Sequence, residues 1–365
     1  MSRFTRILHW GPISIVGAAL IAHMASVSAS HELRDIRHAA NNGIDSAECG
    51  SKRSPCRSIS QALANASHGD LIVVGPGRYG DLNNDGALGG PGEERGGPGC
   101  NCVLLIDKRV SLRSEEGATA TVLDAKNIFS GVSGFVVRIV VDDVALGRAG
   151  HGFTIKGSGA AGGVSLGAVR NVTVAGNVFN DNPGGVSIPS GGRDNIIVNN
   201  FAVGSGGSAF DINGSGNLVW RNTAINNGDG FTIQGEKNLV IGNVATGNIA
   251  GFSILGGSAH EVVGNSAFGN TDAGVRIFPS ATASIHRNNI FGNGDQTLNI
   301  SAPALNCGIL NQSGQEISAT RNFWGVRSGP GPDPADQVCD VAGSRTLTEP
   351  VAEVPFTVPN QWSLF

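Results

Sequence analysis

The chain has 365 residues, of which 15% are charged, and its formal net charge is -4 at pH 7. A mildly acidic chain with so few charges lacks the basic surface that nucleic-acid binding requires, so we expect no nucleic-acid partner. Its 55 glycines are numerous, but they lack the triplet period of collagen. The composition therefore excludes a collagen-like protein and opposes a nucleic-acid-binding one.

Residues 1–29 have the three parts of a secretory signal. Arg3 and Arg6 give a basic start, the apolar stretch ISIVGAALIAHMA follows, and the small residues SVSA predict cleavage at the end of the segment. The alternative is a membrane anchor, but Pro12 and His23 interrupt a stretch shorter than the roughly 18 apolar residues that a spanning helix needs. We therefore expect a secreted protein, extracellular, periplasmic or at the cell surface, with no membrane span after cleavage.

All six cysteines follow the predicted cleavage site, and an even number in an oxidising compartment indicates three disulfides. The spacing favours Cys49 with Cys56 and Cys307 with Cys339. Metal binding by the CNC motif is the weaker alternative, because a zinc site usually has two spaced Cys or His pairs. The cysteines are Cys49, Cys56, Cys100, Cys102, Cys307 and Cys339.

Residues 80–101 form a Gly-rich insertion that begins with the sequence GDLNNDG. Asp81, Asn83 and Asp85 fit the opening of a calcium loop, where carboxylate and amide oxygens stand at alternate positions. The bidentate Glu expected at loop position 12 is missing, because Gly92 stands there. An ordinary glycine-rich loop is therefore the alternative, and calcium is the only cofactor that the sequence suggests.

The middle of the chain repeats itself every 21 to 24 residues. Short apolar triplets mark the repeat, and a Gly precedes nearly all of them. Self-similarity at such a period is typical of a solenoid. Leucine-rich repeats share the period, but their Leu-x-x-Leu-x-Leu frame is absent. The triplets are VSL at 164, VSI at 186, FDI at 210, FTI at 231, FSI at 252 and VRI at 275.

Two columns of asparagine run in step with the triplets. A short amide side chain bonds to turn backbone and tolerates left-handed geometry. Stacked coils place equivalent residues roughly 4.8 Å apart, so their amides can form ladders. We therefore expect structural roles for the first column, Asn177, Asn200, Asn222, Asn243, Asn265 and Asn288, and for the second, Asn182, Asn227, Asn248, Asn270 and Asn293.

Side chains alternate along a strand, so the first and third residues of each triplet point one way and the middle residue points the other. Phe210, Phe231 and Phe252 should therefore stack on one another inside. The middle residues should line the outer face, which we call the groove face. They are Ser187, Asp211, Thr232, Ser253 and Arg276.

These Gly-triplet-Asn coils resemble the right-handed parallel β-helix repeats of the pectate-lyase-like superfamily, over roughly residues 70–350. The stretch CGSKRSPCRSISQALANASHGDLIVVGPGRY is similar to the N-terminal module of secreted bacterial members, with a short helix over about 59–66 that caps the open end. NFWGVRSGPGPDPADQVC is similar to their closing coil. The resemblance implies an all-β solenoid, a single-stranded right-handed parallel β-helix with an N-terminal capping helix.

A solenoid grows by repetition, so we expect one domain after the signal peptide. The expected boundaries are 1–29 for the signal peptide, 30–70 for the N-terminal module with its capping helix, 71–350 for the β-helix with its insertion at 80–101, and 351–365 for a C-terminal tail.

The resemblance also implies where a site would lie, because enzymes of this kind cleave or epimerise polysaccharides on the outer face of the triplet sheet. A lyase or epimerase needs a proton-abstracting base, and a cation or hydrogen-bond donors that neutralise a uronate carboxylate. The catalytic candidates are Asp211, Arg276, Lys237 and His260. The candidates for binding a glycan are Ser187, Thr232, Ser253 and Trp220. Asp229, in the sequence NGDG, is interpreted as part of a turn.

Two functions fit these observations. The Arg-x-Pro-x-x-Arg of pectate lyases and the Asp-Pro-His of alginate epimerases are absent. The groove face is mostly Ser and Thr, and the acidic net charge opposes an anionic ligand. The sequence therefore favours a monomeric, non-catalytic protein that binds extracellular or cell-surface polysaccharide through its groove face. A polysaccharide lyase or epimerase acting on an acidic uronate glycan is the alternative.

Overall fold

The computed structural model describes residues 35–126, 128, 134–157, 161–294, 306–332 and 334–358. The predicted signal peptide lies outside these residues, as does the end of the predicted tail. Within the described residues, no helix has the length and apolar character needed to cross a membrane.

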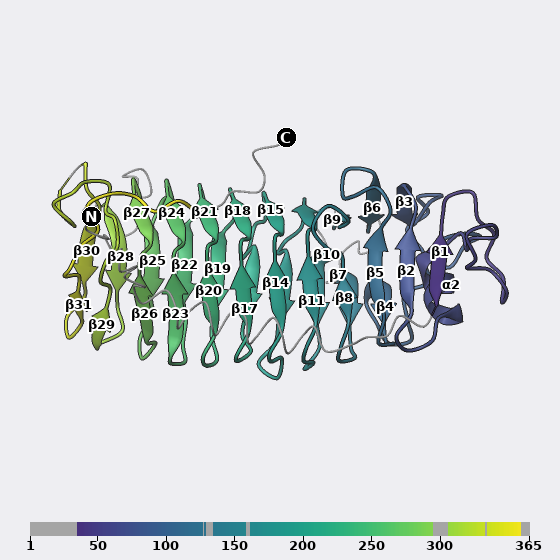
Figure 1. Cartoon of the computed structure of the whole chain (residues 1–365), viewed down its shortest axis with the longest axis horizontal. Coiled ribbons are helices and arrows are strands. Elements are labelled where there is room, and N and C mark those ends of the chain that lie inside the picture. Colours follow the sequence, from purple (N-terminus) through teal and green to yellow (C-terminus); the bar gives the residue numbers. More distant parts are fainter. Residues whose placement is uncertain are drawn as a thin grey trace, which may run out of the picture.

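The described strands form three long parallel sheets that run along one axis of the molecule (Figure 1). Each coil of the chain contributes one strand to each sheet in turn. One coil, for example, consists of β16 (Phe210–Ile212), β17 (Leu218–Trp220) and β18 (Thr223–Ile225). The next coil pairs with it in parallel, so that Phe210 lies beside Phe231. The chain is therefore a parallel β-helix.

Within the described residues, the strands are distributed over three sheets. In spatial order, the twelve-stranded sheet contains β1 (Ile36–Ala39), β2 (Leu71–Val74), β5 (Ser111–Ser114), β8 (Ala145–Leu146), β11 (Thr173–Ala175), β14 (Ile196–Val198), β17, β20 (Leu239–Ile241), β23 (His260–Val263), β26 (Ala283–His286), β29 (Glu316–Ser318) and β31 (Arg345–Leu347). The ten-stranded sheet contains β30 (Gln337–Asp340), β28 (Cys307–Asn311), β25 (Ala273–Ile277), β22 (Ala250–Ile254), β19 (Asp229–Ile233), β16, β13 (Val186–Ile188), β10 (Ala161–Leu166), β7 (Gly134–Ile139) and β4 (Cys102–Ile106). The nine-stranded sheet contains β27 (Asn289–Phe291), β24 (Ser266–Phe268), β21 (Val244–Thr246), β18, β15 (Phe201–Val203), β12 (Val178–Asn180), β9 (Thr154–Lys156), β6 (Thr121–Asp124) and β3 (Gly77–Gly80).

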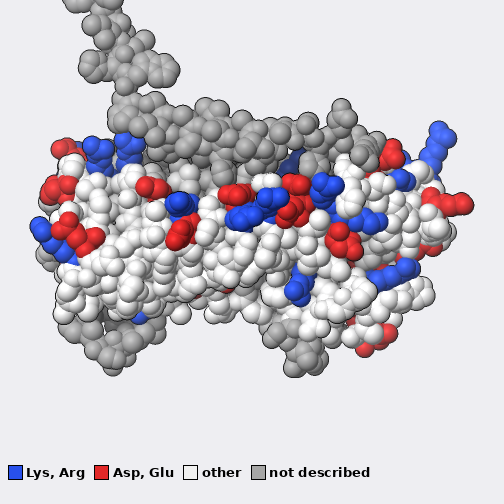
Figure 2. Space-filling model, turned by 90° about the horizontal axis from the view of Figure 1, so that it is seen from below, with Lys and Arg blue, Asp and Glu red and all other residues white. Residues whose placement is uncertain are grey.

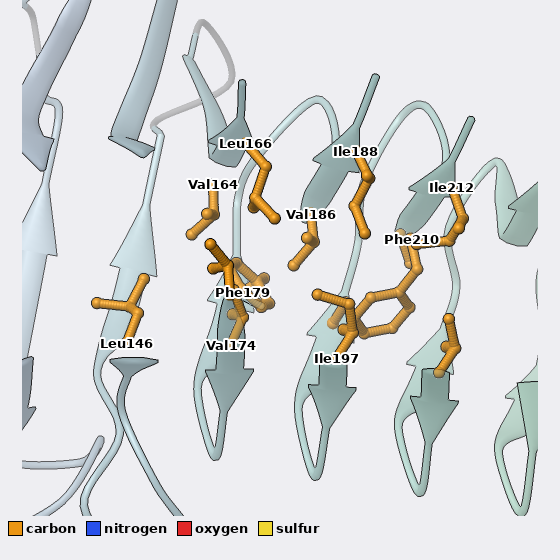
Figure 3. Close-up of a cluster of buried hydrophobic side chains, with 14 of the residues drawn as sticks. Leu146, Val164, Leu166, Val174, Phe179, Val186, Ile188, Ile197, Phe210 and Ile212 are labelled. Atoms are coloured by element: carbon orange, nitrogen blue, oxygen red, sulfur yellow. The ribbon is translucent and has the colours of Figure 1, made fainter. Parts of the chain in front are cut away.

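Apolar side chains from all three sheets meet in the interior of the coils (Figure 3). The predicted phenylalanine stack is confirmed, because the ring centroids of Phe210 and Phe231 are 4.9 Å apart, as are those of Phe231 and Phe252. Phe179 extends the column with an edge-to-face contact to Phe210 at 6.4 Å. Burying these rings away from water is the main driving force that holds successive coils together.

The predicted asparagine ladders are also confirmed. Along the first ladder, and along the second from Asn227 onward, the Oδ1 of each Asn accepts from both the backbone N–H and the Nδ2 of the Asn in the preceding coil, as Asn243 does from Asn222 at 2.8 and 3.1 Å. Ser205 interrupts the second ladder, so within the described chain Asn182 is not joined to it. The Nδ2 of Asn243 in turn donates to the carbonyl oxygen of Val219. These amides satisfy turn backbone groups that would otherwise be buried without partners, which is costly.

A third ladder was not predicted. It runs through Asn195, Asn217 and Asn238 at the turns between the ten- and twelve-stranded sheets, with bonds of 2.9 to 3.1 Å between successive members. Its last rung is a histidine, because the N–H of Asn238 donates to Nδ1 of His260 at 3.4 Å. Because the column has His in place of Asn at this rung, its repeat is harder to recognise in the sequence.

A seven-residue helix, α2 (Ile59–Asn65), lies beside β1 at one end of the solenoid (Figure 1). Ser58 begins the helix, and its hydroxyl accepts from the N–H of Gln61 at 3.1 Å. Such an N-cap satisfies one of the unpaired donors in the first turn. The buried carboxylate of Glu94, which belongs to the Gly-rich insertion, accepts from the N–H groups of Ile59 and Ser60 at 2.8 and 2.7 Å. The insertion is thereby attached to the start of the helix.

Three disulfides join the cysteines. Cys49 pairs with Cys56 and Cys307 pairs with Cys339, as the spacing predicted. Cys100 pairs with Cys102, so the CNC motif is a disulfide and offers no thiolate to a metal ion. Cys49–Cys56 follows the first strand and Cys307–Cys339 joins β28 to β30, so both lie near the ends of the solenoid.

Charged side chains are concentrated in a narrow band on one face of the solenoid. Figure 2 shows Lys, Arg, Asp and Glu mixed along the long axis, while most of the rest of that face is uncharged. Among the described residues, oppositely charged side chains also pair between coils, as Arg170 does with Asp142 at 3.0 Å. Positive and negative side chains are therefore mixed on the described part of this face.

Candidate functional site

The middle residues of the triplets form one row on the outer face of the ten-stranded sheet. Register pairs join Ser187, Asp211, Thr232, Ser253 and Arg276 in this order, so their predicted alignment is confirmed. Their exposure differs. Ser187, Asp211 and Arg276 are half-buried, whereas Thr232 and Ser253 are only 4% and 1% exposed. The prediction that all five residues line the surface is therefore wrong for these two.

Neighbouring polar groups explain the burial of the two residues. The hydroxyl oxygens of Ser208 and Thr232 are 2.5 Å apart, and Ser253 lies beside the carboxylate of Asp229. Asp229 does not sit in a plain turn, because it begins β19 and pairs with Ala250. Burial raises the pKa of Asp229, while the Ser253 hydroxyl and the Ala250 N–H partly oppose that rise. The Asp229 carboxyl therefore belongs to the groove face, which the interpretation of NGDG as a turn did not predict.

Asp211 is the acidic centre of the row. The Nδ2 of Asn213 donates to both of its carboxylate oxygens at 3.1 and 3.0 Å, and the Ser187 hydroxyl donates at 3.5 Å. Burial raises the pKa of Asp211, and these donors moderate the rise because they favour the charged form. Asn213 lies two residues after Asp211 on the same side of the chain, a spacing that could have identified it in the sequence.

A pocket of about 320 Å³ opens beside Asp211. Its apolar wall includes the half-buried ring of Phe135, and Ser187, Ser208 and Asp211 supply polar groups. Glycines in and before β10 and β13 leave its floor without side chains. At Gly162, a Cβ atom would come within 2.8 Å of the Phe135 ring. Phe135 precedes the regular repeats, so the column pattern contained no signal for it.

Arg276 is occupied by partners on its own part of the face. Its Nη1 forms an ion pair with Asp272 at 3.1 Å, and its Nε donates to Gln312 at 3.3 Å. Its guanidinium also lies 4.5 Å from the centroid of the Phe278 ring. The positive charge is therefore already balanced and stacked, which reduces its ability to neutralise an incoming carboxylate.

The other candidates predicted from the sequence lie elsewhere. His260 is fully buried in the third asparagine ladder, and its Nε2 is 3.1 Å from the Gly256 carbonyl oxygen. Lys237 is exposed in a turn with φ of 56°. Trp220 is on the twelve-stranded sheet, where the Arg221 guanidinium covers its ring at 4.5 Å. The structure therefore groups none of these three with Asp211.

The candidate calcium loop is held together by its own hydrogen bonds. The oxygens of Asp81 accept from the N–H groups of Asn84 and Gly86 at 2.6 and 2.8 Å. Asn83 and Asp85 are exposed and bond to each other. Among the described residues, the carboxylates of this loop do not converge as a group of three ligands. A calcium ion at this loop remains a prediction.

Comparison with known proteins shows a family match over part of the chain. Residues 130–297 match the family described as "Periplasmic copper-binding protein (NosD)". A comparison with curated protein sequences found no match. Among solved structures, the pectate lyase Pel9A is 20% identical with a TM-score of 0.50, over 92% of this chain and 79% of that one. A rhamnogalacturonan lyase is 14% identical with a TM-score of 0.54, over 86% and 87%.

The residues of the matched segment do not fit a copper site. Copper is bound by His, Cys and Met side chains, and the sequence has no Cys or Met between 130 and 297. Its histidines have other contacts: His151 lies against the carbonyls of Ser114 and Glu115, His260 is in the ladder, and His286 lies beside Glu261. Elsewhere in the described chain, the one metal-like cluster contains the disulfide-bonded Cys49 and Cys56.

At such low sequence identities, the likeness to the two lyases establishes the fold and leaves the activity open. The parallel strand pairing, the period of the coils and the stacked asparagines agree with that fold. The chain is a right-handed parallel β-helix repeat protein with the fold of the pectate-lyase-like superfamily.

Proposed function

We propose that this protein binds a polysaccharide on the outer face of its ten-stranded sheet, with a sugar unit in the pocket beside Asp211. The observation that carries the proposal is the carboxylate of Asp211, fixed by Asn213 at the wall of a pocket that also presents an aromatic ring. The size of the pocket is near the lower end of the roughly 300–1,000 Å³ range of small-molecule sites.

The chemistry of the pocket suits a sugar ring. Asp211 and Ser187 offer oxygens that accept hydrogen bonds from hydroxyl groups, and a carboxylate accepts two of them at once. The Phe135 ring supplies the apolar surface against which the C–H face of a sugar packs. The bare glycine floor allows a ring to approach the backbone closely. The two solved structures described above are named as lyases of pectate and rhamnogalacturonan, which agrees with a polysaccharide ligand.

The charges favour a neutral glycan over a uronate polymer. Asp211 is the only charged residue among the described residues that line the pocket, and it would repel a carboxylate. Two arginines, Arg138 and Arg276, continue the row at three register steps from Asp211 on either side. Neither is among the residues that line the pocket, and Arg276 is already paired with Asp272. The net charge of the chain is also negative. We therefore infer a hydroxyl-rich, uncharged ligand at this pocket.

The same contacts favour binding over catalysis. A lyase or epimerase needs a base next to a positive group that neutralises the substrate carboxylate. Lys237 and His260 lie away from Asp211, and the charge of Arg276 is balanced. We therefore keep the non-catalytic assignment and infer that Asp211 positions the ligand.

The three disulfides support a location outside the cytoplasm, because such bonds persist in oxidising compartments. The matched family is described as periplasmic, which agrees with this location. We propose an extracellular or periplasmic protein whose glycan-binding face is open to the surrounding polysaccharide.

Affinity electrophoresis tests the proposal. The purified protein would be run through gels that contain either neutral polysaccharides such as galactan, mannan and glucan or the uronate polymers polygalacturonate and alginate. We expect retardation by at least one neutral polymer, loss of that retardation in Phe135→Ala, and normal retardation in Trp220→Ala, which alters the twelve-stranded sheet. Retardation by uronate polymers alone, together with a rise in ultraviolet absorbance from new carbon–carbon double bonds, would overturn the proposal in favour of an eliminase.

A further inference from the structure

A second feature lies at the corner between the twelve- and nine-stranded sheets. There, the residue directly before each rung of the first asparagine ladder adopts a left-handed backbone conformation, with φ between 53° and 69°. Glycine and asparagine tolerate this conformation, whereas a larger side chain is strained in it. The residues in this column are Gly176, Asn199, Arg221, Gly242, Gly264, Arg287 and Arg321.

The three arginines differ from the glycine or asparagine found at the other positions of this column. A packing contact accounts for one of them. Arg221 stacks on the ring of Trp220, with its guanidinium 4.5 Å from the ring centroid. Within the described residues, Arg287 and Arg321 have no ring contact of this kind and take part in no ion pair. Backbone strain that no packing contact explains is commonly found at functional sites.

Arg287 and Arg321 lie side by side although the sequence separates them. Each directly precedes a ladder asparagine, and Asn288 donates to Oδ1 of Asn322 from its N–H at 2.9 Å and from its Nδ2 at 3.0 Å. These bonds place the two coils in register, so the two arginine backbones are one coil apart, about 4.8 Å. The two arginine side chains thus leave the same corner from adjacent coils. Like charges at such short spacing repel each other.

The surrounding groups leave the charge of the pair uncompensated. The carboxylate of Glu261 is 3.8 Å from His286, and no ion pair joins it to either arginine in the described chain. Burial first, and then the charges of Arg287 and Arg321, lower the pKa of His286, so this ring is neutral near pH 7. The backbone N–H of Arg321 donates to the carbonyl oxygen of Pro350, which anchors the turn while the side chain stays exposed.

We propose that Arg287 and Arg321 form a binding site for an oxyanion, a sulfate or phosphate group that is either free or carried on a polymer. A guanidinium presents a planar fork of N–H donors that matches such a group, and two adjacent forks can hold it from both sides. A bound anion would also remove the repulsion between the two arginines. The site is at a corner away from the ten-stranded sheet, so it is independent of the neutral-glycan pocket.

Glycine substitutions provide a sharp test, because glycine is the natural residue at other positions of the column. Thermal unfolding of the wild type, Arg287→Gly, Arg321→Gly and the double variant would be measured in chloride and in low-millimolar inorganic sulfate at equal ionic strength. Without sulfate we expect both glycine variants to unfold at a higher temperature than the wild type, because strain and repulsion are relieved. With sulfate we expect a stabilising shift in the wild type that is lost in the double variant.

Further measurements separate the sources of the anion. Dextran sulfate, neutral dextran and inorganic sulfate would each be titrated into the wild type and the double variant, with Arg221→Gly as the matched control from the same column. We expect about tenfold weaker binding of the sulfated probes by the double variant and unchanged binding by Arg221→Gly. A response to inorganic sulfate identifies a free ion as sufficient, and a response to dextran sulfate alone identifies a polymer-borne group. Equal responses of the wild type and the double variant to every probe would overturn the proposal.

Discussion

The Nδ2 of Asn213 donates hydrogen bonds to both carboxylate oxygens of Asp211, at 3.1 and 3.0 Å. Both residues project from the same side of one chain segment, at the outer face of the ten-stranded sheet. This arrangement fixes the orientation of the carboxylate before a ligand arrives. Pre-organised groups of this kind bind better because less freedom is lost on association.

Glycan binding should weaken as the pH falls. Burial raises the pKa of Asp211 above its ordinary value of 3.8, and the ionised form is the one that accepts hydrogen bonds from a ligand. Affinity should therefore be complete at pH values above the raised pKa and should decline as the pH drops through it. Titration of the wild type and of Asp211→Asn across the acidic range checks this. A wild-type decline that Asp211→Asn shares to the same extent would assign the effect to another group.

Removing one rung of an asparagine ladder should destabilise the solenoid strongly. Asn243 is fully buried, and its side chain bonds to Asn222, Asn265 and the carbonyl oxygen of Val219. Asn243→Ala leaves several buried groups without partners, so we expect a loss of roughly 2–4 kcal/mol in the free energy of unfolding. Urea unfolding measures the change, with the exposed Asn180→Ala as the control. Equal stabilities of the two variants would show that the ladder is not a stabilising element.

The phenylalanine column should be equally sensitive. Phe231 is sandwiched between Phe210 and Phe252 with both centroid distances at 4.9 Å, and it is fully buried. Phe231→Ala should cost about 3–5 kcal/mol, because it removes buried surface and leaves a cavity. Phe268→Ala is a matched control, since Phe268 is stacked on Phe291 but is half-buried, and it should cost clearly less. Urea unfolding measures the loss in the free energy of unfolding for both variants, and equal losses would contradict this prediction.

His260 should make the stability depend on pH. Burial lowers its pKa below the ordinary 6.5, so the unfolded chain takes up a proton at a higher pH than the folded one. The contribution of the neutral ring is therefore complete above about pH 6.5 and is lost as the pH falls below that value. His260→Asn, which continues the ladder, should lose less stability between pH 7 and pH 5 than the wild type. Identical pH profiles for the two proteins would contradict this role.

The repeat pattern was sufficient to predict the fold, the phenylalanine stack and two of the three asparagine ladders. A nearly constant spacing separates Phe210, Phe231 and Phe252, and likewise the asparagines beside them. In stacked coils, residues that are one repeat apart in the sequence lie in contact. The helix at Ile59–Asn65 and two of the disulfides were likewise visible as local signals. These features depend on the residues of one coil and its neighbour.

The site was harder to predict because it depends on contacts outside the repeat. Phe135 comes from a coil before the regular triplets, and Asp229 lies two residues before the Phe231 triplet, at the start of β19. His260 was predicted as a catalytic candidate, whereas the structure buries it in the asparagine ladder. Burial of Thr232 likewise arises from Ser208, in a different coil. These contacts join side chains from different coils at positions that do not recur from coil to coil, so the repeat pattern does not predict them.

The most direct test of the central proposal is calorimetric titration of the wild type, Asp211→Asn and Asn213→Ala with an oligosaccharide of the neutral polymer that retards the protein most. We predict that both substitutions weaken binding about tenfold or more, while the folded state and its unfolding temperature change little, because the two side chains are only half-buried. Wild-type affinity in Asp211→Asn would contradict the proposed function, because the glycan would then bind without the carboxylate on which the site is built.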